Sequence, residues 1–386
     1  MMQMKLTDIC DFQGGSQPPK EEWSFDEQEG YIRMLQIRDF TQGERVTPEY
    51  IKISNTTKIC EANDILIARY GASIGKILTG LAGAYNVAIM RTIPDTSRIK
   101  KQYLYYYLKS SYFQNAILNV GSRAAQAGFN KEDLSKLDIE CPELIKQDKI
   151  IAVLEKIEDI IEKRKIELSD LDTLIKARFV EMFGDPVTNP KGLPIVALGE
   201  LSELITKGAS PSWQGFSYTD DSSQTIFVTS ENVREGYIDL SSPKYIEDGF
   251  NEKQKRSVIH KGDFLINIVG ASIGRAAQFN LDCKANMNQA AALVRVNDSR
   301  VRDKYLLTYL NSDRAQRMYD SMKSDTGRAN LSLQDISDLL ILLPNVEQQI
   351  EFEMFANQVD KSKIAVQKAL TETQLLFDSL MQQYFG

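Results

Sequence analysis

The sequence DILIARYGASIGK spans residues 64–76, and the closely similar DFLINIVGASIGR spans residues 263–275. In both copies a short run of apolar residues, typical of a buried β-strand, leads into Gly-Ala-Ser-Ile-Gly. The glycines favour a tight turn directly after the strand, and a cation, Lys76 or Arg275, follows the turn. One chain therefore contains the same predicted strand and turn twice.

The similarity extends along the whole chain, as expected for an internal repeat. The matching segments are KLTDI (5–9) and ALGEL (197–201), QGGSQPP and KGASPSW, YLYYYLKS (103–110) and YLLTYLNS (305–312), DLSKLDIECP (133–142) and DISDLLILLP (335–344), and MFG (182–184) and YFG (384–386). We interpret the chain as two similar units, each a mixture of strands and helices that ends in Phe-Gly.

Long helices are predicted after Pro142 and Pro344, where apolar residues recur at alternating spacings of four and three. The first seam consists of Ile150, Leu154, Ile157, Ile161, Arg164, Leu168, Leu171, Ile175, Arg178 and Met182. The second consists of Phe352, Ala356, Val359, Lys363, Val366, Leu370, Thr373, Phe377, Leu380 and Tyr384. Each helix would be roughly 60 Å long at about 1.5 Å per residue, and an antiparallel pair would bury both seams.

The predicted fold class is α+β with a pseudo-two-fold internal repeat. Two mixed α/β domains, at 1–142 and 185–344, would be separated by two long antiparallel coiled-coil helices at 143–184 and 345–386.

Composition excludes several functions. The net charge of −7 argues against a polycation that coats nucleic acid, and most of the excess acid lies in the two predicted long helices. His260 is the only histidine, and the four cysteines lie far apart, which argues strongly against a Cys/His metal site and a histidine-based triad. No apolar run reaches the roughly 20 residues of a membrane span, and the N-terminus does not resemble a signal peptide. We expect a cytoplasmic protein without a membrane partner.

The sequence GASIGK resembles a phosphate-binding P-loop only superficially. Three residues instead of four separate its glycines, and neither Lys76 nor Arg275 is followed by Ser or Thr. Small residues ending in a cation do suit a DNA phosphate, contacted by Ser73 and Lys76 in the first copy and by Ser272 and Arg275 in the second. The alternative is a turn that serves the backbone alone.

A second candidate region is the polar loop GSRAAQAGFNKED (121–133), which is matched by DTGRANLSLQD (325–335). Arginine reads guanine, whereas Asn and Gln suit adenine, so base contacts are predicted for these side chains. They are Arg123, Gln126 and Asn130 in the first copy, and Arg328 and Asn330 in the second. Further DNA-contact candidates are Arg38, Arg69 and Lys207. For each of these a solvated surface position is the alternative, and for Trp213 a surface and a core position both stay open.

Catalytic motifs are missing from the sequence. It contains no Asn-Pro-Pro-aromatic motif of adenine methyltransferases, no Gly-x-Gly-x-x-Gly after a strand, no Gly-x-Ser-x-Gly, and no carboxylate cluster resembling a nuclease metal site. We expect no catalytic residue and no bound metal in this chain.

With its doubled Gly-Ala-Ser-Ile-Gly motif and the lead-ins CPELIKQ and LPNVEQQ to its long helices, the chain resembles the specificity (S) subunit of type I restriction-modification systems. The resemblance covers essentially all 386 residues. It implies a non-catalytic subunit whose two target recognition domains each read one half of a split DNA sequence, while the helices set the gap between the halves. The first helix departs from the family pattern, because ELIKQ stands where EQ is expected.

The resemblance also implies partners and cofactors. The partners are double-stranded DNA, two methyltransferase (modification) subunits that methylate adenine N6 with S-adenosylmethionine, and a motor-nuclease (restriction) subunit that uses ATP and Mg²⁺. No cofactor is expected in this chain. Two alternatives stay open from the residues alone: a coiled-coil scaffold with protein-binding domains, and a nucleotide-dependent enzyme built on GASIGK.

Overall fold

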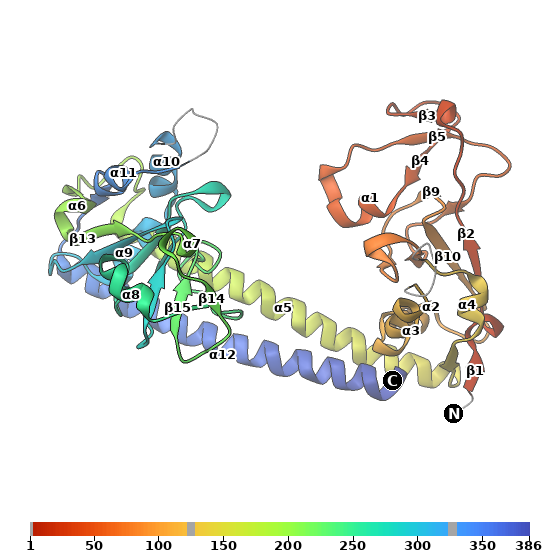
Figure 1. Cartoon of the computed structure of the whole chain (residues 1–386). Helices are drawn as coiled ribbons and strands as arrows, with labels where there is room; N and C mark the ends of the chain where they lie inside the picture. The colour runs from red at the N-terminus through yellow and green to blue at the C-terminus, as the bar shows by residue number, and fades with distance from the viewer. Residues whose placement is uncertain (1–2, 122–127, 323–329) are drawn as a thin grey trace. The chain divides into compact units, whose positions relative to one another are not determined.

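The computed structural model describes residues 3–121, 128–322 and 330–386. The chain divides into two compact units, unit 1 (Met1–Lys165 and Lys368–Gly386) and unit 2 (Ile166–Gln367). Two helices of 40 residues each, α5 (Leu144–Phe183) and α12 (Val346–Phe385), contribute one part to each unit (Figure 1). The units therefore differ from the four predicted segments, because each long helix is shared between them.

Unit 1 is built on an antiparallel sheet with the strand order β2-β10-β7-β8, that is Cys10–Gly14, Ile89–Pro94, Leu66–Ala68 and Ile77–Leu78. A second sheet has the order β3 (Trp23–Ser24), β5 (Tyr50–Lys52), β4 (Tyr31–Leu35), β9 (Gly83–Tyr85) and β6 (Ile59–Cys60). Strands β1 (Gln3–Lys5) and β11 (Asp138–Glu140) form a separate pair. The shorter helices are α1 (Ile37–Gln42), α2 (Lys101–Lys109), α3 (Ser111–Gly121) and α4 (Lys131–Ser135).

Unit 2 repeats this plan. Its main sheet has the corresponding order β13-β20-β17-β18, that is Ser202–Lys207, Ala291–Val296, Phe264–Asn267 and Ala276–Gln278. The second sheet consists of β14 (Tyr218–Thr219), β16 (Tyr245–Ile246), β15 (Thr225–Val228) and β19 (Ala285–Met287), and β12 (Ile195–Ala197) pairs with β21 (Leu340–Leu342). The shorter helices are α6 (Leu198–Leu201), α7 (Pro211–Gln214), α8 (Gly249–Lys253), α9 (Asp303–Leu310), α10 (Asp313–Met322) and α11 (Leu333–Ser337). The equal strand orders confirm the predicted α+β class and the internal repeat.

Buried tyrosines on α2 and α9 connect the helix layer to the strand that precedes each long helix. The Tyr103 and Tyr107 hydroxyls donate to the carbonyls of Glu140 and Asp138, both at 2.9 Å. In unit 2 the Tyr305 and Tyr309 hydroxyls donate to Leu342 and Leu340 at 2.6 and 2.9 Å. Burial raises the pKa of all four phenols. They remain neutral donors, which satisfies the strand carbonyls inside the core.

The long helices pack against each other in antiparallel order, as predicted. Within unit 2, Asp172 of α5 pairs with Lys363 of α12, whereas Arg178, further along α5, pairs with the earlier Glu351 at 2.7 Å. Phe179 contacts Phe352 at a ring distance of 5.4 Å.

The same order holds in unit 1, where Met381 and Phe385 near the end of α12 share a hydrophobic core with Ile150 and Leu154 near the start of α5. The polar seam residues are also satisfied there, since Arg164 donates to the Thr373 hydroxyl.

A buried glutamine fixes the start of each long helix. The Gln147 side chain accepts from the Lys100 amide at 2.7 Å and donates to the carbonyls of Arg98 and Pro142 at 2.9 and 2.7 Å. Gln349 makes the equivalent three bonds to Arg302, Arg300 and Pro344 at 2.8, 2.9 and 2.8 Å. Both side chains are fully buried. In ELIKQ the glutamine, Gln147, is therefore the residue that fixes the helix start. It is the unit 1 equivalent of Gln349 in unit 2.

We predict that Gln349→Leu lowers the free energy of unfolding of unit 2 by about 2–4 kcal/mol, because one buried amide and two buried carbonyls lose their partner. Urea denaturation of the purified chain measures this loss. Gln358→Leu, an exposed position on the same helix, is the matched control and should change stability by no more than about 0.5 kcal/mol. Equal midpoints for the two variants would contradict the role of the buried amide.

Candidate nucleic-acid interface

The predicted turn and loop regions leave each main sheet at one end, which we call the turn end. In unit 2, Lys207 closes β13 and pairs with Ala292, and Asn267 closes β17 and pairs with Ala291. Ile266 pairs with Ala276, the first residue of β18. Because β13 and β17 both pair antiparallel with β20, one on each side, they run in the same direction, and the loop after β13 and the Gly-Ala-Ser-Ile-Gly turn after β17 start at the same end of the sheet. In unit 1 the register Gly14↔Met90, Ala68↔Ile89 and Ile67↔Ile77 creates the same arrangement.

Both Gly-Ala-Ser-Ile-Gly segments adopt the same backbone. A single 3₁₀ turn covers Gly71–Ser73 in unit 1 and Gly270–Ser272 in unit 2. The first glycine of each copy has φ of 72° and 80°, and the second, Gly75 or Gly274, has φ of 81° and 88°. Side chains rarely adopt this left-handed region, which explains the glycines.

The turn is the loop of a hairpin, as the hydrogen bonds show. The amides of Gly75 and Gly274 donate to the carbonyls of Ala68 and Asn267, each at 2.9 Å. The chain then continues into strands β8 and β18, whereas a P-loop opens a helix whose N-terminus faces the phosphate. The geometry therefore does not support the nucleotide-binding alternative.

The ends of the two polar loops lie beside these turns. Tyr70, directly before the turn, forms a β-bridge with Gly128, and Val269 forms the equivalent bridge with Asn330. The Leu331 amide donates to the Ile268 carbonyl at 2.9 Å. The structure thus brings together the two regions that the sequence singled out separately. Arg123, Gln126 and Arg328 lie outside the described residues.

Six of the candidate residues stand at the turn end, four of them exposed and two half-buried. Lys76, Lys207 and Arg275 are exposed, and none of them has an ion-pair partner in the described part of the chain. Ser73 is half-buried on its turn. Ser272 is also half-buried, and its hydroxyl accepts from the Asn267 amide group at 3.1 Å. Asn330 is exposed at its bridge.

Three other candidates have structural partners that the sequence did not reveal. Arg38 of α1 forms an ion pair with Glu49 at 2.5 Å. The Arg69 guanidinium donates to the carbonyls of Phe129 and Val87 at 3.2 and 3.4 Å and lies 5.0 Å from the centre of the Tyr70 ring. Asn130 caps α4, because its side-chain oxygen accepts from the Asp133 amide at 3.1 Å. DNA contact by these residues stays a prediction, and each would have to combine it with its structural task.

Two glycines fix the loops at the turn end, and the sequence analysis did not predict a role for either. A Cβ on Gly15 would lie 2.1 Å from the Asn86 carbonyl oxygen, and one on Gly208 would lie 1.8 Å from that of Met287. Only glycine allows two backbones to approach so closely. The matching QGGS and KGAS segments were the available signal.

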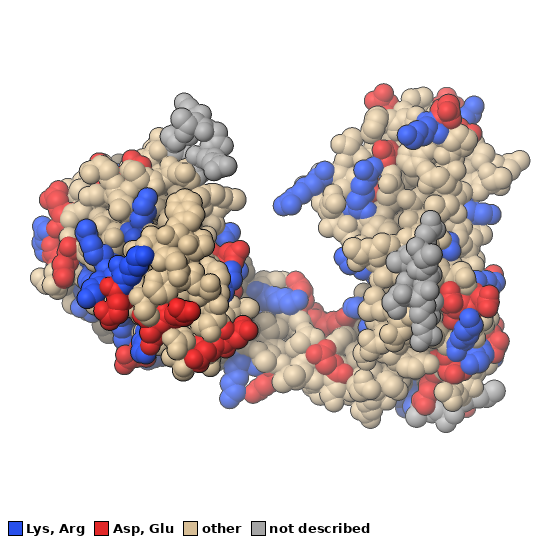
Figure 2. Space-filling model, viewed as in Figure 1, with Lys and Arg blue, Asp and Glu red and all other residues tan. Residues whose placement is uncertain are grey.

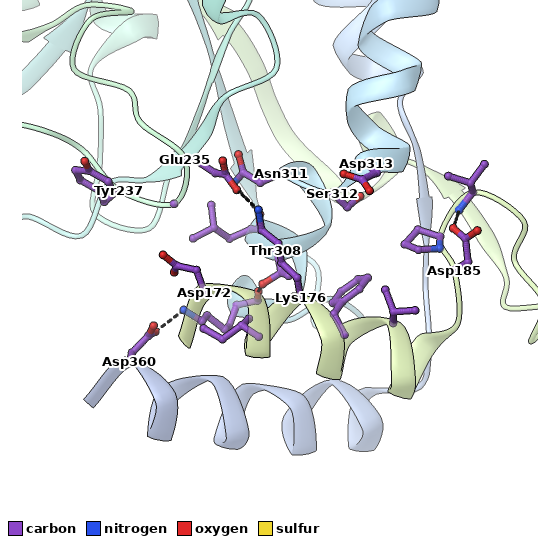
Figure 3. A pocket seen from close by; sticks show the side chains of 18 of the residues that line it. Asp172, Lys176, Asp185, Glu235, Tyr237, Thr308, Asn311, Ser312, Asp313 and Asp360 are labelled. Atoms are coloured by element: carbon purple, nitrogen blue, oxygen red, sulfur yellow. Dashed lines mark hydrogen bonds and ion pairs between the residues drawn. The ribbon is translucent and has the colours of Figure 1, made fainter. Parts of the chain in front are cut away.

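A cavity of about 640 Å³ lies in unit 2, lined by α5, α9, α12 and the segment around Glu235 (Figure 3). Six of its charged groups form ion pairs with one another: Lys176 with Glu235 at 2.8 Å, Lys304 with Asp360 at 2.5 Å, and Lys363 with Asp172. Figure 3 shows Lys176 and Glu235 directed at each other across the cavity wall. Paired charges of this kind do not form an acid and base poised for catalysis.

Other reactive chemistry finds little support in the described residues. They contain no group of three or more His, Cys, Asp or Glu side chains that could hold a metal ion. Burial raises the pKa of Cys60 to about 11 and that of Cys10 to about 12, so both thiols stay protonated and unreactive at neutral pH. Across 3–121, 128–322 and 330–386, every helix is too short or too polar to span a bilayer.

Charge is mixed on the face of both units that Figure 2 shows. On the face shown in Figure 2, acidic side chains lie among the basic ones, and no continuous basic band is visible. Affinity for a polyanion would have to come from a few well-placed cations rather than from a strongly positive surface.

The family model for the type I restriction modification DNA specificity domain matches residues 1–169 and again residues 190–373. The chain therefore belongs to the type I restriction-modification DNA specificity family. The two matched regions correspond to the two copies of the internal repeat, so this finding confirms the predicted family.

Members of the type I specificity family from distant organisms are similar in sequence. The EcoBI specificity subunit of Escherichia coli is 27% identical over 158 residues, which are 40% of this chain and 33% of that subunit. The MjaVIII specificity subunit of Methanocaldococcus jannaschii is 20% identical over 337 residues, which are 84% of this chain and 78% of that protein. The chain thus spans about a third of the EcoBI subunit in the first match and most of the MjaVIII subunit in the second.

Solved structures of type I systems share the fold of this specificity-family chain. A chain from a study of complex assembly and conformational transition of a type I restriction-modification system superposes with a TM-score of 0.63 at 19% identity, covering 100% of this chain and 97% of the other. The S subunit from M. genitalium gives a TM-score of 0.54 at 14% identity and covers 100% and 96%.

We predict that Gly274→Ala destabilises unit 2 more than Gly270→Ala. Both positions force alanine into the left-handed region at a cost of about 1–2 kcal/mol, and Gly270 faces open space. A Cβ on Gly274 would also lie 2.5 Å from the ring of the fully buried Tyr319, which adds about 1–3 kcal/mol of overpacking. Urea denaturation should show the larger shift for Gly274→Ala, and the reverse order would contradict the described packing.

Proposed function

We propose that this chain is the sequence-recognition subunit of a type I restriction-modification complex, and that each unit reads one half of a two-part DNA target. The observation that carries the proposal is the doubled turn end. Two units whose main sheets have the same strand order each present the same hairpin turn with an exposed cation that has no ion-pair partner among the described residues. Two equivalent contact sites in one chain suit a target with two parts.

The turn residues would hold the DNA in register. Lys76, Lys207 and Arg275, together with Ser73 and Ser272, would contact phosphates, which position a protein on the duplex without reading its sequence. The polar loops would supply base contacts through Arg123, Gln126, Arg328 and Asn330, since Arg pairs with guanine and Asn or Gln with adenine. Arg38, Arg69 and Asn130 would contribute from the flanks.

The two long helices would set the spacing between the half-sites. Each contains 40 residues, or about 60 Å along its axis, which exceeds the roughly 34–36 Å of one DNA turn. Because the helices are shared by the units, a change in helix length would alter the gap in the target without altering either half.

The chemistry would come from partner subunits. Methyltransferase subunits using S-adenosylmethionine would methylate adenine N6, a motor-nuclease subunit would use ATP and Mg²⁺, and this chain would remain non-catalytic. Exposed apolar side chains on the long helices support docking of two methyltransferase subunits. Met354 and Ile364 of α12 are 70% and 71% exposed, and Ile145 of α5 is 70% exposed. Such residues favour a partner surface over a solvated rod.

Co-expression with its methyltransferase subunit should yield a complex that methylates adenine in a two-part motif, mapped by methylome sequencing. Exchanging residues 191–344 for the matching segment of a related subunit should change one half of that motif and leave the other half and the gap intact. An uninterrupted motif, or a complex that assembles without methylating any motif, would contradict the proposed function and favour a protein-binding scaffold.

The double variant Lys76→Ala, Arg275→Ala should weaken binding of the assembled complex to all DNA sequences alike. The slope of log affinity against log salt concentration should fall by about 1 for each phosphate contact that is lost. Lys261→Ala is the matched control, because Lys261 is an exposed cation that precedes β17 at the opposite end of the sheet. A salt slope that is unchanged by the double variant would remove Lys76 and Arg275 from the interface.

A further inference from the structure

The side chain of Trp213 extends into solvent at the turn end of unit 2. The loop of residues 208–217, which we call the Trp213 loop, follows β13 directly and contains the short helix α7 (Figure 1). Trp213 is 85% exposed, the largest exposed fraction among the large apolar side chains of the described residues. Trp23, the other tryptophan of the chain, is half-buried, and its indole N–H donates to the Pro18 carbonyl at 3.1 Å.

The exposure of Trp213 does not come from a loose segment. Before it, Gly208 packs directly on the Met287 backbone and Pro211 is buried. After it, the Lys253 ammonium donates to the Gln214 carbonyl at 2.8 Å. Phe216 packs edge-on against the buried Phe250 at a ring distance of 5.6 Å. Contacts on both sides of Trp213 therefore hold the indole out into solvent.

An indole held exposed on a fixed turn keeps its apolar surface in water, where a partner can cover it. Buried aromatic side chains typically remove about 150–250 Å² from water, and Trp213 gains almost none of that stabilisation in the chain alone. Fixing the turn in advance also lowers the entropic cost of binding, because the backbone that carries the indole has little freedom left to lose.

The surroundings of Trp213 indicate a polyanionic partner. Residues 207–218 include Lys207 and no Asp or Glu, and Ser210 and Ser212 place hydroxyl groups on either side of the helix start. The loop starts at the same sheet end as Ser272 and Arg275. A segment without negative charge beside exposed cations suits DNA.

We propose that the indole of Trp213 packs against DNA, on the bases or deoxyriboses of the half-site that unit 2 reads; this inference rests on the proposed function. Unit 1 lacks the equivalent. Its loop after β2 carries no aromatic residue before Trp23, which is the first residue of β3 and is held by Pro18. The contact is therefore specific to one of the two half-sites.

The test uses the complex assembled with its methyltransferase subunits and a duplex that contains the methylated motif. Trp213→Ala should weaken binding about tenfold, since stacking of an aromatic side chain on a base has an effect of this order, and Trp213→Phe should recover most of the loss. Ile195→Ala is the matched control, because Ile195 is also an exposed apolar residue, at 48%. It lies in β12, which comes before the start of β13, whereas Trp213 follows the end of β13 at the turn end. Ile195→Ala should bind like the parent.

A spectroscopic readout reports on the indole itself. In a Trp23→Phe chain that incorporates 5-hydroxytryptophan, position 213 carries the only reporter, and this analogue can be excited apart from the tryptophans of unlabelled partner subunits. Its emission should change on addition of the target duplex and much less with a duplex altered in the half-site of unit 2.

Unchanged affinity of Trp213→Ala together with unchanged emission would overturn the inference while the proposed function stands, provided that the parent complex still methylates its two-part motif. Loss of co-purification with the methyltransferase subunit in Trp213→Ala would also overturn it, because the partner would then be a protein. A parent complex without any motif would instead refute the proposed function, and this inference with it.

Discussion

The buried glutamine at the start of each long helix is the interaction on which the rest of each unit depends. Gln147 and Gln349 each bond to three backbone groups. Two of these belong to the segment directly before the tyrosine-bearing helix, α2 or α9, and the third belongs to the proline that precedes the long helix. A single side chain therefore joins the mixed sheet-and-helix region to the coiled coil. Because the amide is fully buried, leaving any of these groups unpaired would be costly, and this holds the joint in one geometry.

The joint and the turn end have different tasks. The tyrosines and glutamines sit in the core, where hydrogen bonds are strong and few alternatives exist, and they carry no exposed chemistry. At the turn end the pattern is reversed. Glycines that tolerate left-handed φ or close backbone approach let loops leave the sheet side by side, and the polar and basic side chains on them stay available. Such a division between a rigid scaffold and variable loops is typical of recognition proteins.

The charge of the chain agrees with a subunit that works in a complex. Neither unit has a continuous basic face in the view of Figure 2, and many of its cations pair with nearby carboxylates. DNA affinity would then depend on a few positioned cations, on the apolar contact proposed for Trp213, and on partner subunits that close around the duplex. The exposed apolar side chains of the long helices are the surface that we propose for those partners.

Much of the fold could be predicted from local patterns. Strand-turn units, tyrosine helices and heptad seams are visible in short windows, and the repeat doubled every signal. The heptad pattern even placed the polar residues Arg164 and Thr373 in the two seams, and these residues form a hydrogen bond with each other in the antiparallel pair. The candidate site was less predictable. The sequence singled out the Gly-Ala-Ser-Ile-Gly turns and the polar loops, but it could not show that Tyr70 meets Gly128 and Val269 meets Asn330.

The sequence by itself determined the two-unit plan, the long helices and the family, because these depend on periodicity and motif order along the chain. Only the tertiary structure decided which side chains are available at the turn end. Asn130 caps a helix, Arg69 binds two carbonyls, and Trp213 faces solvent instead of a core. The physical reason is that hydrogen-bond partners and burial are set by residues far away in sequence, and no local pattern specifies them.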